Sequence, residues 1–190
     1  MKKMLRKQMI ETLKEMSEAT YRARSRKIQD RLTSLELVKN AKTIALTMSN
    51  FPEVETRDLI RYLWKNQKII VVPKCDVKSK KMHFYAIDSF EQLEVVYAGI
   101  EEPIPSKTKL IGEEQIDVVI VPGVLFNIEG YRIGFGGGYY DRFLATYHGN
   151  TISLAFSEQV VETIPVESHD LPVQIIVTDE QIIGEEKNYA

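Results

Sequence analysis

The chain has 190 residues, of which 44% are hydrophobic and 27% are charged, as expected for a single globular domain spanning residues 1–190. Its formal net charge of -2 argues against broad binding to nucleic acid or to membrane surfaces, which usually requires a basic excess. Its one cysteine, Cys75, excludes a disulfide framework and favours a reducing, cytoplasmic setting, and its histidines are too far apart in the sequence for a zinc motif.

Helical spacing of apolar residues and short apolar runs rich in β-branched residues define the elements of the first half. In chain order we expect helices over residues 2–16 and 18–35, a strand over 43–48, a helix over 57–67, a strand over 68–73 and an edge strand over 82–87. Thr56 is expected to cap the helix that follows it, and Pro73 to close its strand. Ser89 and Gln92 predict a capping box on a short helix.

The basic start of the chain is interpreted as an ordinary helix. It lacks the apolar core of a secretory signal, and Glu11 and Glu15 are atypical of an acid-poor transit peptide. No apolar run in the sequence is long enough to span a bilayer.

The second half continues the alternation of strands and helices. Residues 101–115 are polar and indicate only a loop, whereas the apolar run over 117–127 predicts a central strand covered on both faces. A helix over 139–147, a strand over 151–156, a helix near 158–163 and a strand over 174–179 follow. The pattern predicts a three-layer α/β fold with a mostly parallel central sheet and helices on both faces.

In such sheets ligands bind beyond the carboxyl ends of the strands. This rule selects the loop after Met48, the loop after Val121 and the segment after Phe156.

A glycine-rich stretch, "RIGFGGGYYDRFL" at residues 132–144, lies in the region that this rule selects. Glycine permits positive φ and removes the Cβ that would hold a ligand away from the backbone amides. Successive N–H groups and the start of the following helix can then bind an anion, and Arg132 can add a bidentate phosphate contact. The stretch is neither a dinucleotide fingerprint nor a P-loop, so a tight structural turn is the alternative to a phosphate site.

Asp141 lies in the first turn of the helix behind the glycines. A carboxylate there would repel a bare phosphate, but it suits a Mg²⁺ ion that bridges phosphate oxygens. It also suits the positive end of the helix dipole, and the sequence leaves both interpretations open.

Residues 121–144, "VPGVLFNIEGYRIGFGGGYYDRFL", closely resemble the signature of the 5-formyltetrahydrofolate cyclo-ligase family, also called methenyltetrahydrofolate synthetases. "KKMLR" near the N-terminus, "MSNFPEVET" after the first strand and "SHDLPV" near the end follow in the family's order, so the resemblance covers essentially the whole chain. Asn127 stands where the family often has aspartate and is expected to affect only the turn through Gly130. Phe135 stands where the family often has tyrosine or a basic residue, which bears on how the pterin packs.

The resemblance implies an enzyme that uses ATP and Mg²⁺ to convert 5-formyltetrahydrofolate into 5,10-methenyltetrahydrofolate, releasing ADP and phosphate. It assigns Arg132 and Asp141 to catalysis, and Asp141 and Asp170 to Mg²⁺. It assigns to ATP Lys2, Lys3, Met4, Leu5, Arg6, Arg132, Ile133, Gly134, Phe135, Gly136, Gly137, Gly138, Tyr139 and Tyr140. It assigns to the folate Met48, Glu53, Phe135, Gly136, Gly137, Gly138 and Tyr139.

Each assignment has a plainer alternative. Lys2 and Arg6, one helical turn apart, fit a solvated helix face, Met48 fits the core, and Glu53 fits an acid that precedes a helix. Tyr140 either stacks on adenine or packs into the core. A further basic group, favoured as a solvated hairpin over a contact to the glutamate tail of folate, comprises Lys74, Lys78, Lys80 and Lys81.

Two other functional classes compete with the cyclo-ligase. One is a non-catalytic nucleotide- or folate-binding protein of the same fold, which would have no need of Mg²⁺ ligands. The other is an acyl- or phosphosugar-handling α/β enzyme, which rests on fold analogy alone. A monomer is favoured, although the sequence does not determine the oligomeric state.

Overall fold

The computed structural model describes residues 1–186, which form five α-helices and twelve strands. The helices are α1 (Lys2–Lys14), α2 (Glu18–Ser34), α3 (Glu36–Asn40), α4 (Arg57–Lys65) and α5 (Tyr139–Leu144). The strands are β1 (Thr43–Ala45), β2 (Ile69–Asp76), β3 (Lys81–Ile87), β4 (Leu93–Tyr97), β5 (Ile100–Pro103), β6 (Lys109–Ile111), β7 (Val118–Ile120), β8 (Leu125–Phe126), β9 (Arg132–Ile133), β10 (Asn150–Ala155), β11 (Ile175–Thr178) and β12 (Ile182–Ile183).

Eight strands form one central sheet in the order β12-β11-β10-β7-β1-β2-β3-β6. The five strands from β11 to β2 are parallel, whereas β12, β3 and β6 pair antiparallel at the two ends of the sheet. The predicted α/β fold with a mostly parallel sheet is confirmed.

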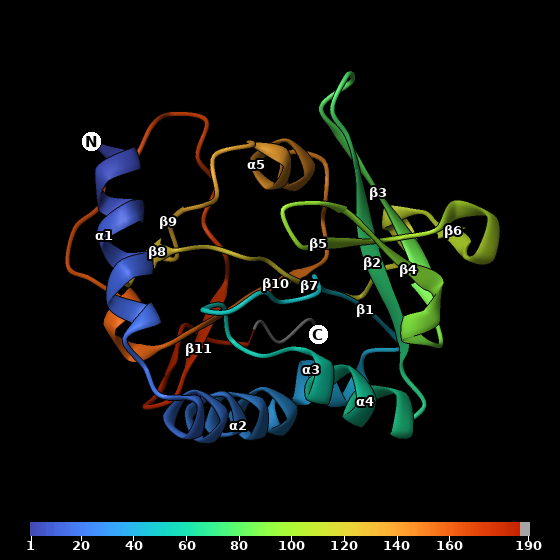
Figure 1. The fold of residues 1–190 in the computed structure, drawn as a ribbon, viewed down its shortest axis with the longest axis horizontal. Helices are drawn as coiled ribbons and strands as arrows, with labels where there is room; N and C mark the ends of the chain where they lie inside the picture. Colours follow the sequence, from blue (N-terminus) through green and yellow to red (C-terminus); the bar gives the residue numbers. More distant parts are fainter. Residues whose placement is uncertain (187–190) are drawn as a thin grey trace.

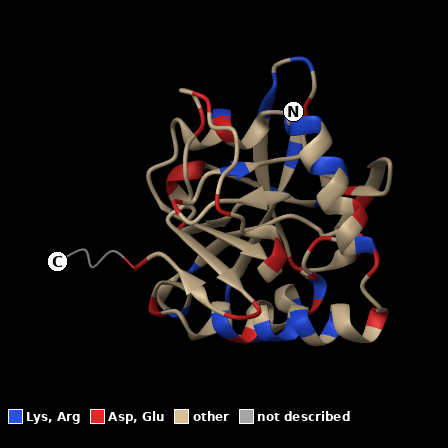
Figure 2. Ribbon diagram, turned by 90° about the vertical axis from the view of Figure 1, so that its left-hand side faces the viewer, with Lys and Arg blue, Asp and Glu red and all other residues tan. Residues whose placement is uncertain are grey.

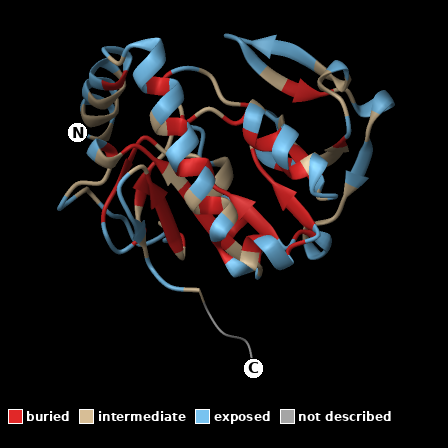
Figure 3. Ribbon diagram, turned by 90° about the horizontal axis from the view of Figure 1, so that it is seen from below, coloured by how far each residue is buried: buried red, intermediate tan, exposed pale blue. Residues whose placement is uncertain are grey.

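Helices cover both faces of this sheet (Figure 1). α2 packs on β11 and α4 on β2, whereas α5 packs on β3 from the opposite side. The pleat of β1 explains both contacts, since Ile44 belongs to the apolar cluster beneath α2 and α4 and Ala45 to the cluster beneath α5. Figure 3 shows the resulting pattern, in which the strands at the centre of the sheet are buried and the outer faces of the helices are exposed.

The sheet order places a topological switch point between β1 and β7. From β1 the chain moves outward to β2 on one side, and from β7 it moves outward to β10 and β11 on the other. The connections that leave the carboxyl ends of β1 and β7 therefore diverge and leave a crevice between them. The same order, 2-1-3-4-5 among the parallel strands, occurs in flavodoxin-like folds, where ligands bind at this point.

The predicted end of β2 at Pro73 and the predicted edge position of β3 are wrong. β2 continues to Asp76 and pairs with β3 throughout, with Pro73 opposite Phe84. A proline fits here because β1 pairs only as far as Val71, so the following residues of β2 form an edge on that side. β6, inside the segment expected to be a loop, covers the outer side of β3.

The predicted strand over residues 117–127 is also wrong, because it divides into β7 and β8 at Pro122 and Gly123. Two buried polar side chains satisfy the carbonyl groups of this turn: the Ser153 hydroxyl donates to Val121 O at 2.7 Å, and Gln159 Nε2 donates to Val124 O at 3.0 Å. The turn directs the chain away from the sheet and into the crevice.

Two details of helix capping and extent differ from the sequence prediction. Thr56 precedes α4, but its hydroxyl donates to Thr47 O at 2.9 Å and accepts from Ser49 N at 2.9 Å, so it closes the loop after β1. The Glu55 carboxylate caps α4 instead, accepting from Arg57 N at 2.6 Å. The helix expected near 158–163 is only a 3-10 turn, Ser157–Gln159, whereas the predicted Ser89 capping box is confirmed.

The turn between β8 and β9 positions Arg132 at the crevice. Asn127 Oδ1 accepts hydrogen bonds from the N–H groups of Glu129 and Tyr131, each at 3.1 Å. Gly130 follows with φ of 95°, and a Cβ at this position would overlap the carbonyl oxygen of Val173. The turn therefore requires glycine for its backbone conformation and for its close approach to the segment before β11.

Gly130→Ala is expected to lower the melting temperature by about 10 °C. Strain at positive φ and steric overlap each cost roughly 1–3 kcal/mol, and 1 kcal/mol corresponds to about 2–4 °C at this chain length. Gly134→Ala is the matched control, because no atom lies within 4 Å of the position its Cβ would take. Thermal unfolding followed by circular dichroism measures both variants, and equal melting temperatures would contradict the proposed constraint.

Candidate active site

A cavity of about 1000 Å³ opens at the carboxyl ends of β1 and β7. Its walls come from one face of α1, the loop after β1, the end of β2, the β4–β5 hairpin, the turn after β7 and residues 132–141. It therefore lies at the switch point of the sheet, and the loops after β1 and β7 line it as the sequence predicts. The segment after β10 contributes Gln159.

Most of the residues singled out in the sequence line this one cavity. They are Lys2, Arg6, Met48, Glu53, Arg132, Ile133, Gly134, Phe135, Gly136, Gly137, Gly138, Tyr139, Tyr140, Asp141 and Asp170. Lys3, Met4 and Leu5 are not among the lining residues, since they lie on other faces of α1, and Met4 is 62% exposed.

The glycine-rich stretch forms an exposed rim of the cavity directly before α5. Gly136 and Gly138 have φ values of 103° and 72°, which a residue with a Cβ rarely adopts. Arg6, on α1, donates from Nε to Gly134 O at 2.6 Å, and its guanidinium lies against the open side of Gly136. Its two Nη groups have no hydrogen-bond partner among residues 1–186, so they are available to a ligand held by the glycines.

The N-terminal end of α1 also contacts the segment around Asp170. Figure 2 shows Lys and Arg residues gathered at this end of the helix. Lys2 Nζ lies 3.4 Å from Asp170 Oδ2 and 3.5 Å from Glu167 Oε1. Burial opposes ionisation of Asp170, but the Glu167 N–H and the Lys2 ammonium outweigh it and lower the pKa of this carboxyl. Asp170 is therefore held as a carboxylate at the cavity wall.

Arg132 is a buried cation whose donors are largely engaged. Nε donates to Pro122 O at 3.2 Å, Nη1 donates to Leu171 O at 3.3 Å, and Nη2 lies 3.4 Å from Asp141 Oδ1. Burial lowers the pKa of Arg132, and Asp141 opposes that shift. A bidentate phosphate contact would have to displace some of these partners, so the geometry favours Arg132 as the group that positions Asp141.

Glu53 is a half-buried carboxyl in the loop after β1 and has no ion-pair partner among residues 1–186. Burial raises its pKa to about 7, and a hydrogen bond from Asn50 N at 3.1 Å opposes this shift. Tyr21 Oη donates to Glu53 O at 2.6 Å, which fixes the backbone at this position. Met48 belongs to the same loop, is buried and also lines the cavity.

Asp141 and Asp170 provide the kind of ligands that Mg²⁺ prefers. Both carboxyl groups line the cavity, and both influence the pKa of Arg132 from its vicinity. No group of three or more acidic, histidine or cysteine side chains within residues 1–186 could hold a metal ion alone. Two carboxylates fit Mg²⁺ when phosphate oxygens and water complete its shell, so the residues present fit a Mg²⁺–ATP site.

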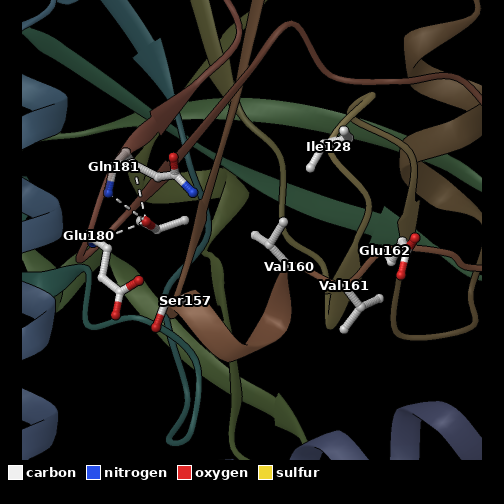
Figure 4. Close-up of a pocket in the computed structure, with 8 residues that line it drawn as sticks. Ile128, Ser157, Val160, Val161, Glu162, Glu180 and Gln181 are labelled. Carbon is white, nitrogen blue, oxygen red and sulfur yellow. Dashed lines mark hydrogen bonds between the residues drawn. The ribbon is translucent and has the colours of Figure 1, made fainter.

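The four lysines interpreted either as a solvated hairpin or as contacts to the glutamate tail of folate do not line this cavity. Lys74 forms an ion pair with Glu102 at 3.3 Å, and Lys78, Lys80 and Lys81 are exposed at the β2–β3 hairpin. A second hollow of about 350 Å³ (Figure 4) contains none of the predicted residues. Within it, Thr178 Oγ1 accepts hydrogen bonds from the N–H groups of Glu180 and Gln181.

The β4–β5 hairpin is a cavity wall that the sequence analysis missed. Val96, Tyr97 and Ile100 line the cavity although they are exposed, and an ion pair between Arg57 and Glu101 ties the hairpin to α4. The connecting residues Ala98 and Gly99 both have positive φ, as a two-residue hairpin turn requires. The signal was the dipeptide between two apolar runs, weakened by alanine in place of the usual asparagine or aspartate.

Within residues 1–186, no helix has the length and apolar character needed to cross a membrane.

Comparisons with known proteins agree on one family. The sequence model of the 5-formyltetrahydrofolate cyclo-ligase family matches residues 1–179. The 5-formyltetrahydrofolate cyclo-ligase of Escherichia coli K12 is 31% identical over 156 residues, covering 80% of this chain and 86% of that protein. An NMR structure of 5,10-methenyltetrahydrofolate synthetase from Aquifex aeolicus is similar with a TM-score of 0.86 and 34% identity, covering 100% of this chain and 95% of that one. The Mycoplasma pneumoniae enzyme of the same name has a TM-score of 0.76 and 28% identity, covering 94% and 99%.

The raised pKa of Glu53 predicts a pH dependence of stability. Its pKa is about 7 in the folded protein, above the ordinary value of 4.5, so between these pH values the folded state holds a proton that the unfolded state has released. The contribution of Glu53 to the free energy of unfolding is therefore complete below pH 4.5. It is lost as the pH rises through 7, which lowers the free energy of unfolding by roughly 1–3 kcal/mol.

Glu53→Gln should flatten this loss, making the variant more stable than the wild type at pH 8 but not at pH 5. Denaturant unfolding at the two pH values measures the difference, and Glu162→Gln at an exposed position is the control. Parallel pH profiles for the wild type and Glu53→Gln would show that Glu53 titrates normally.

Proposed function

Because the chain belongs to the 5-formyltetrahydrofolate cyclo-ligase family, and is an enzyme that converts 5-formyltetrahydrofolate into 5,10-methenyltetrahydrofolate, we propose that ATP drives this reaction by phosphorylating the formyl oxygen inside the cavity. One observation carries the proposal: the glycine-rich stretch and the Glu53 loop face a single cavity at the β1–β7 switch point.

The chemistry explains why a phosphate-binding loop and a folate site must meet. A formamide is a poor electrophile, because N5 donates electrons into the carbonyl and oxide is a very poor leaving group. Transfer of the γ-phosphoryl group to the formyl oxygen gives an iminium phosphate and ADP. N10 then attacks the formyl carbon and loses its proton, the C–O bond breaks, and inorganic phosphate leaves. Catalysis consists mainly of positioning and of neutralising phosphate charge.

The phosphate side of the site is assigned to the rim of the cavity. The N–H groups of residues 134–138 bind phosphate oxygens, and Arg6 supports them with its free Nη groups. Lys2 adds positive charge next to Asp170. We assign no contact to Lys3, Met4 and Leu5, because they do not line the cavity.

Asp141 and Asp170 are the proposed Mg²⁺ ligands. When bound, the ion would neutralise phosphate charge. Arg132 holds Asp141 at the cavity wall, and Lys2 holds Asp170 there until a ligand arrives. Both carboxylates are thus kept in place by neighbouring cations rather than by the metal.

The folate side is assigned to the loop after β1. Ionised Glu53 accepts hydrogen bonds from the amino and ring N–H groups of the pterin, and Met48 packs against its flat face. Phe135 and Tyr139, together with the glycines between them, contact the folate from the other side. The assignment accounts for an acidic side chain that is half-buried without an ion-pair partner among residues 1–186.

Family membership sets aside the two other functional classes, the non-catalytic binder and the acyl- or phosphosugar-handling enzyme. A cytoplasmic location is proposed, which fits a lone cysteine that needs no oxidising compartment.

Coupled turnover is the direct test of the proposed function. Protein, 5-formyltetrahydrofolate labelled with oxygen-18 in the formyl group, ATP and Mg²⁺ are mixed in ordinary water. ADP and methenyltetrahydrofolate should form in equal amounts, and the label should appear in the phosphate, because the C–O bond breaks while the new P–O bond survives. Unlabelled phosphate would mean that ATP hydrolysis drives the reaction without phosphorylating the substrate.

Arg6→Ala should raise the KM for ATP by about tenfold and change the KM for folate little, because a charge-assisted phosphate contact contributes roughly 1.5–3 kcal/mol. Lys3→Ala removes a positive charge from the same helix at an exposed position outside the cavity and is the matched control. Steady-state kinetics with each substrate varied separately give the KM for ATP and the KM for folate of both variants. Equal effects of the two variants would assign Arg6 to general electrostatics.

A further inference from the structure

The hydroxyl group of Tyr140 is a buried polar group with no hydrogen-bond partner among residues 1–186. No other side-chain nitrogen or oxygen in that part of the chain is buried and unpartnered in this way. Leaving a buried hydroxyl unpaired costs stability, so its presence calls for a compensating role. A tyrosine that only filled the core could be phenylalanine without loss.

The Tyr140 side chain belongs to the wall of the cavity. Tyr140 lines the cavity at the start of α5, and the groups that act on its pKa are Cys75, Arg132 and Glu53, all lining residues. A phenol is protonated at neutral pH, so this hydroxyl can donate its proton in a hydrogen bond. Arg132 belongs to the wall that holds Asp141, and Glu53 to the wall assigned to the pterin.

We propose that the Tyr140 hydroxyl donates a hydrogen bond to the formyl oxygen of the bound folate. The inference rests on the proposed function, in which the formyl group lies where the folate side and the phosphate side of the cavity meet. Tyr140 lines the same cavity as Glu53, on the folate side, and as Arg132, which holds Asp141 on the phosphate side. Tyr140 would thus take a role in positioning the substrate, distinct from stacking on adenine or packing in the core.

The chemistry of a carbonyl oxygen allows both contacts at once. The formyl oxygen has two lone pairs, so one can accept from Tyr140 while the other faces the γ-phosphorus. The hydrogen bond fixes the rotation of the formyl group about its bond to N5. It also persists on the bridging oxygen when that oxygen leaves with phosphate, and Tyr140 keeps its own proton throughout; the proton lost on ring closure is that of N10.

Tyr140→Phe tests the proposal through stability and binding together. Without its unpaired hydroxyl, the ligand-free variant should melt at the same temperature as the wild type or about 2–4 °C higher. Calorimetric titration without ATP, so that no turnover occurs, should show about tenfold weaker binding of 5-formyltetrahydrofolate. Binding of 5-methyltetrahydrofolate, which lacks the formyl oxygen, should change by less than about twofold.

Tyr147→Phe is the control, because Tyr147 is buried outside the cavity and its hydroxyl donates to Ile116 O at 2.9 Å. It should lower the melting temperature and leave folate binding unchanged. Unchanged 5-formyltetrahydrofolate binding by Tyr140→Phe, or equal weakening for both folates, would overturn the proposal. A lower melting temperature of Tyr140→Phe would also overturn it, by showing a partner within the protein. Failure of wild-type turnover, in contrast, would count against the proposed function.

Discussion

The buried guanidinium of Arg132 is the interaction on which the cavity depends. It donates hydrogen bonds to a carbonyl oxygen in the turn after β7 and to another in the segment before β11. It also forms an ion pair with the Asp141 carboxylate on α5. A buried cation is costly unless such acceptors surround it, so its burial holds these three segments in one arrangement. The tight turn at Gly130 supports the arrangement by bringing β9 against Val173. The position of Asp141 follows from this one charge.

The site is assembled from the two ends of the chain. Arg6 and Lys2, within the first helical turns, reach Gly134 and Asp170 through contacts that span more than a hundred residues of sequence. Spacing on α1 fixes which of its residues can take part, because Lys2, Arg6 and Ile10 share one face while Lys3 and Met4 lie on others. A helix that is mostly exposed thus becomes part of the binding wall, and its position relative to the glycines decides how well phosphate is held.

The sequence predicted the elements whose patterns are long and local, and it failed where a neighbouring strand or a tertiary contact decides. α1, α2 and β10 follow from periodicity, whereas β2 passes through Pro73 only because β1 is too short to pair there. The motif residues of the site could be identified, since each lies in a recognisable local stretch. The Lys2–Asp170 pair and the β4–β5 wall could not, because both depend on how distant segments meet. Val95 and Val96 of β4 are both exposed, so β4 lacks the alternation of buried and exposed residues by which a strand is predicted.

Two groups at the centre of the cavity are destabilising in the free protein. Glu53 loses hydration without gaining an ion pair among residues 1–186, and the Tyr140 hydroxyl is buried without an acceptor there. A ligand with complementary polar groups would supply the missing hydrogen bonds: ring N–H groups would donate to the carboxylate, and a carbonyl oxygen would accept from the phenol. The site is therefore organised before the substrate arrives, and part of the binding free energy comes from satisfying groups that folding leaves unpaired. Because Tyr140 lines the same cavity as Glu53 of the pterin wall and Arg132, which holds Asp141, a folate that satisfies both groups would bring its formyl group next to the phosphate rim.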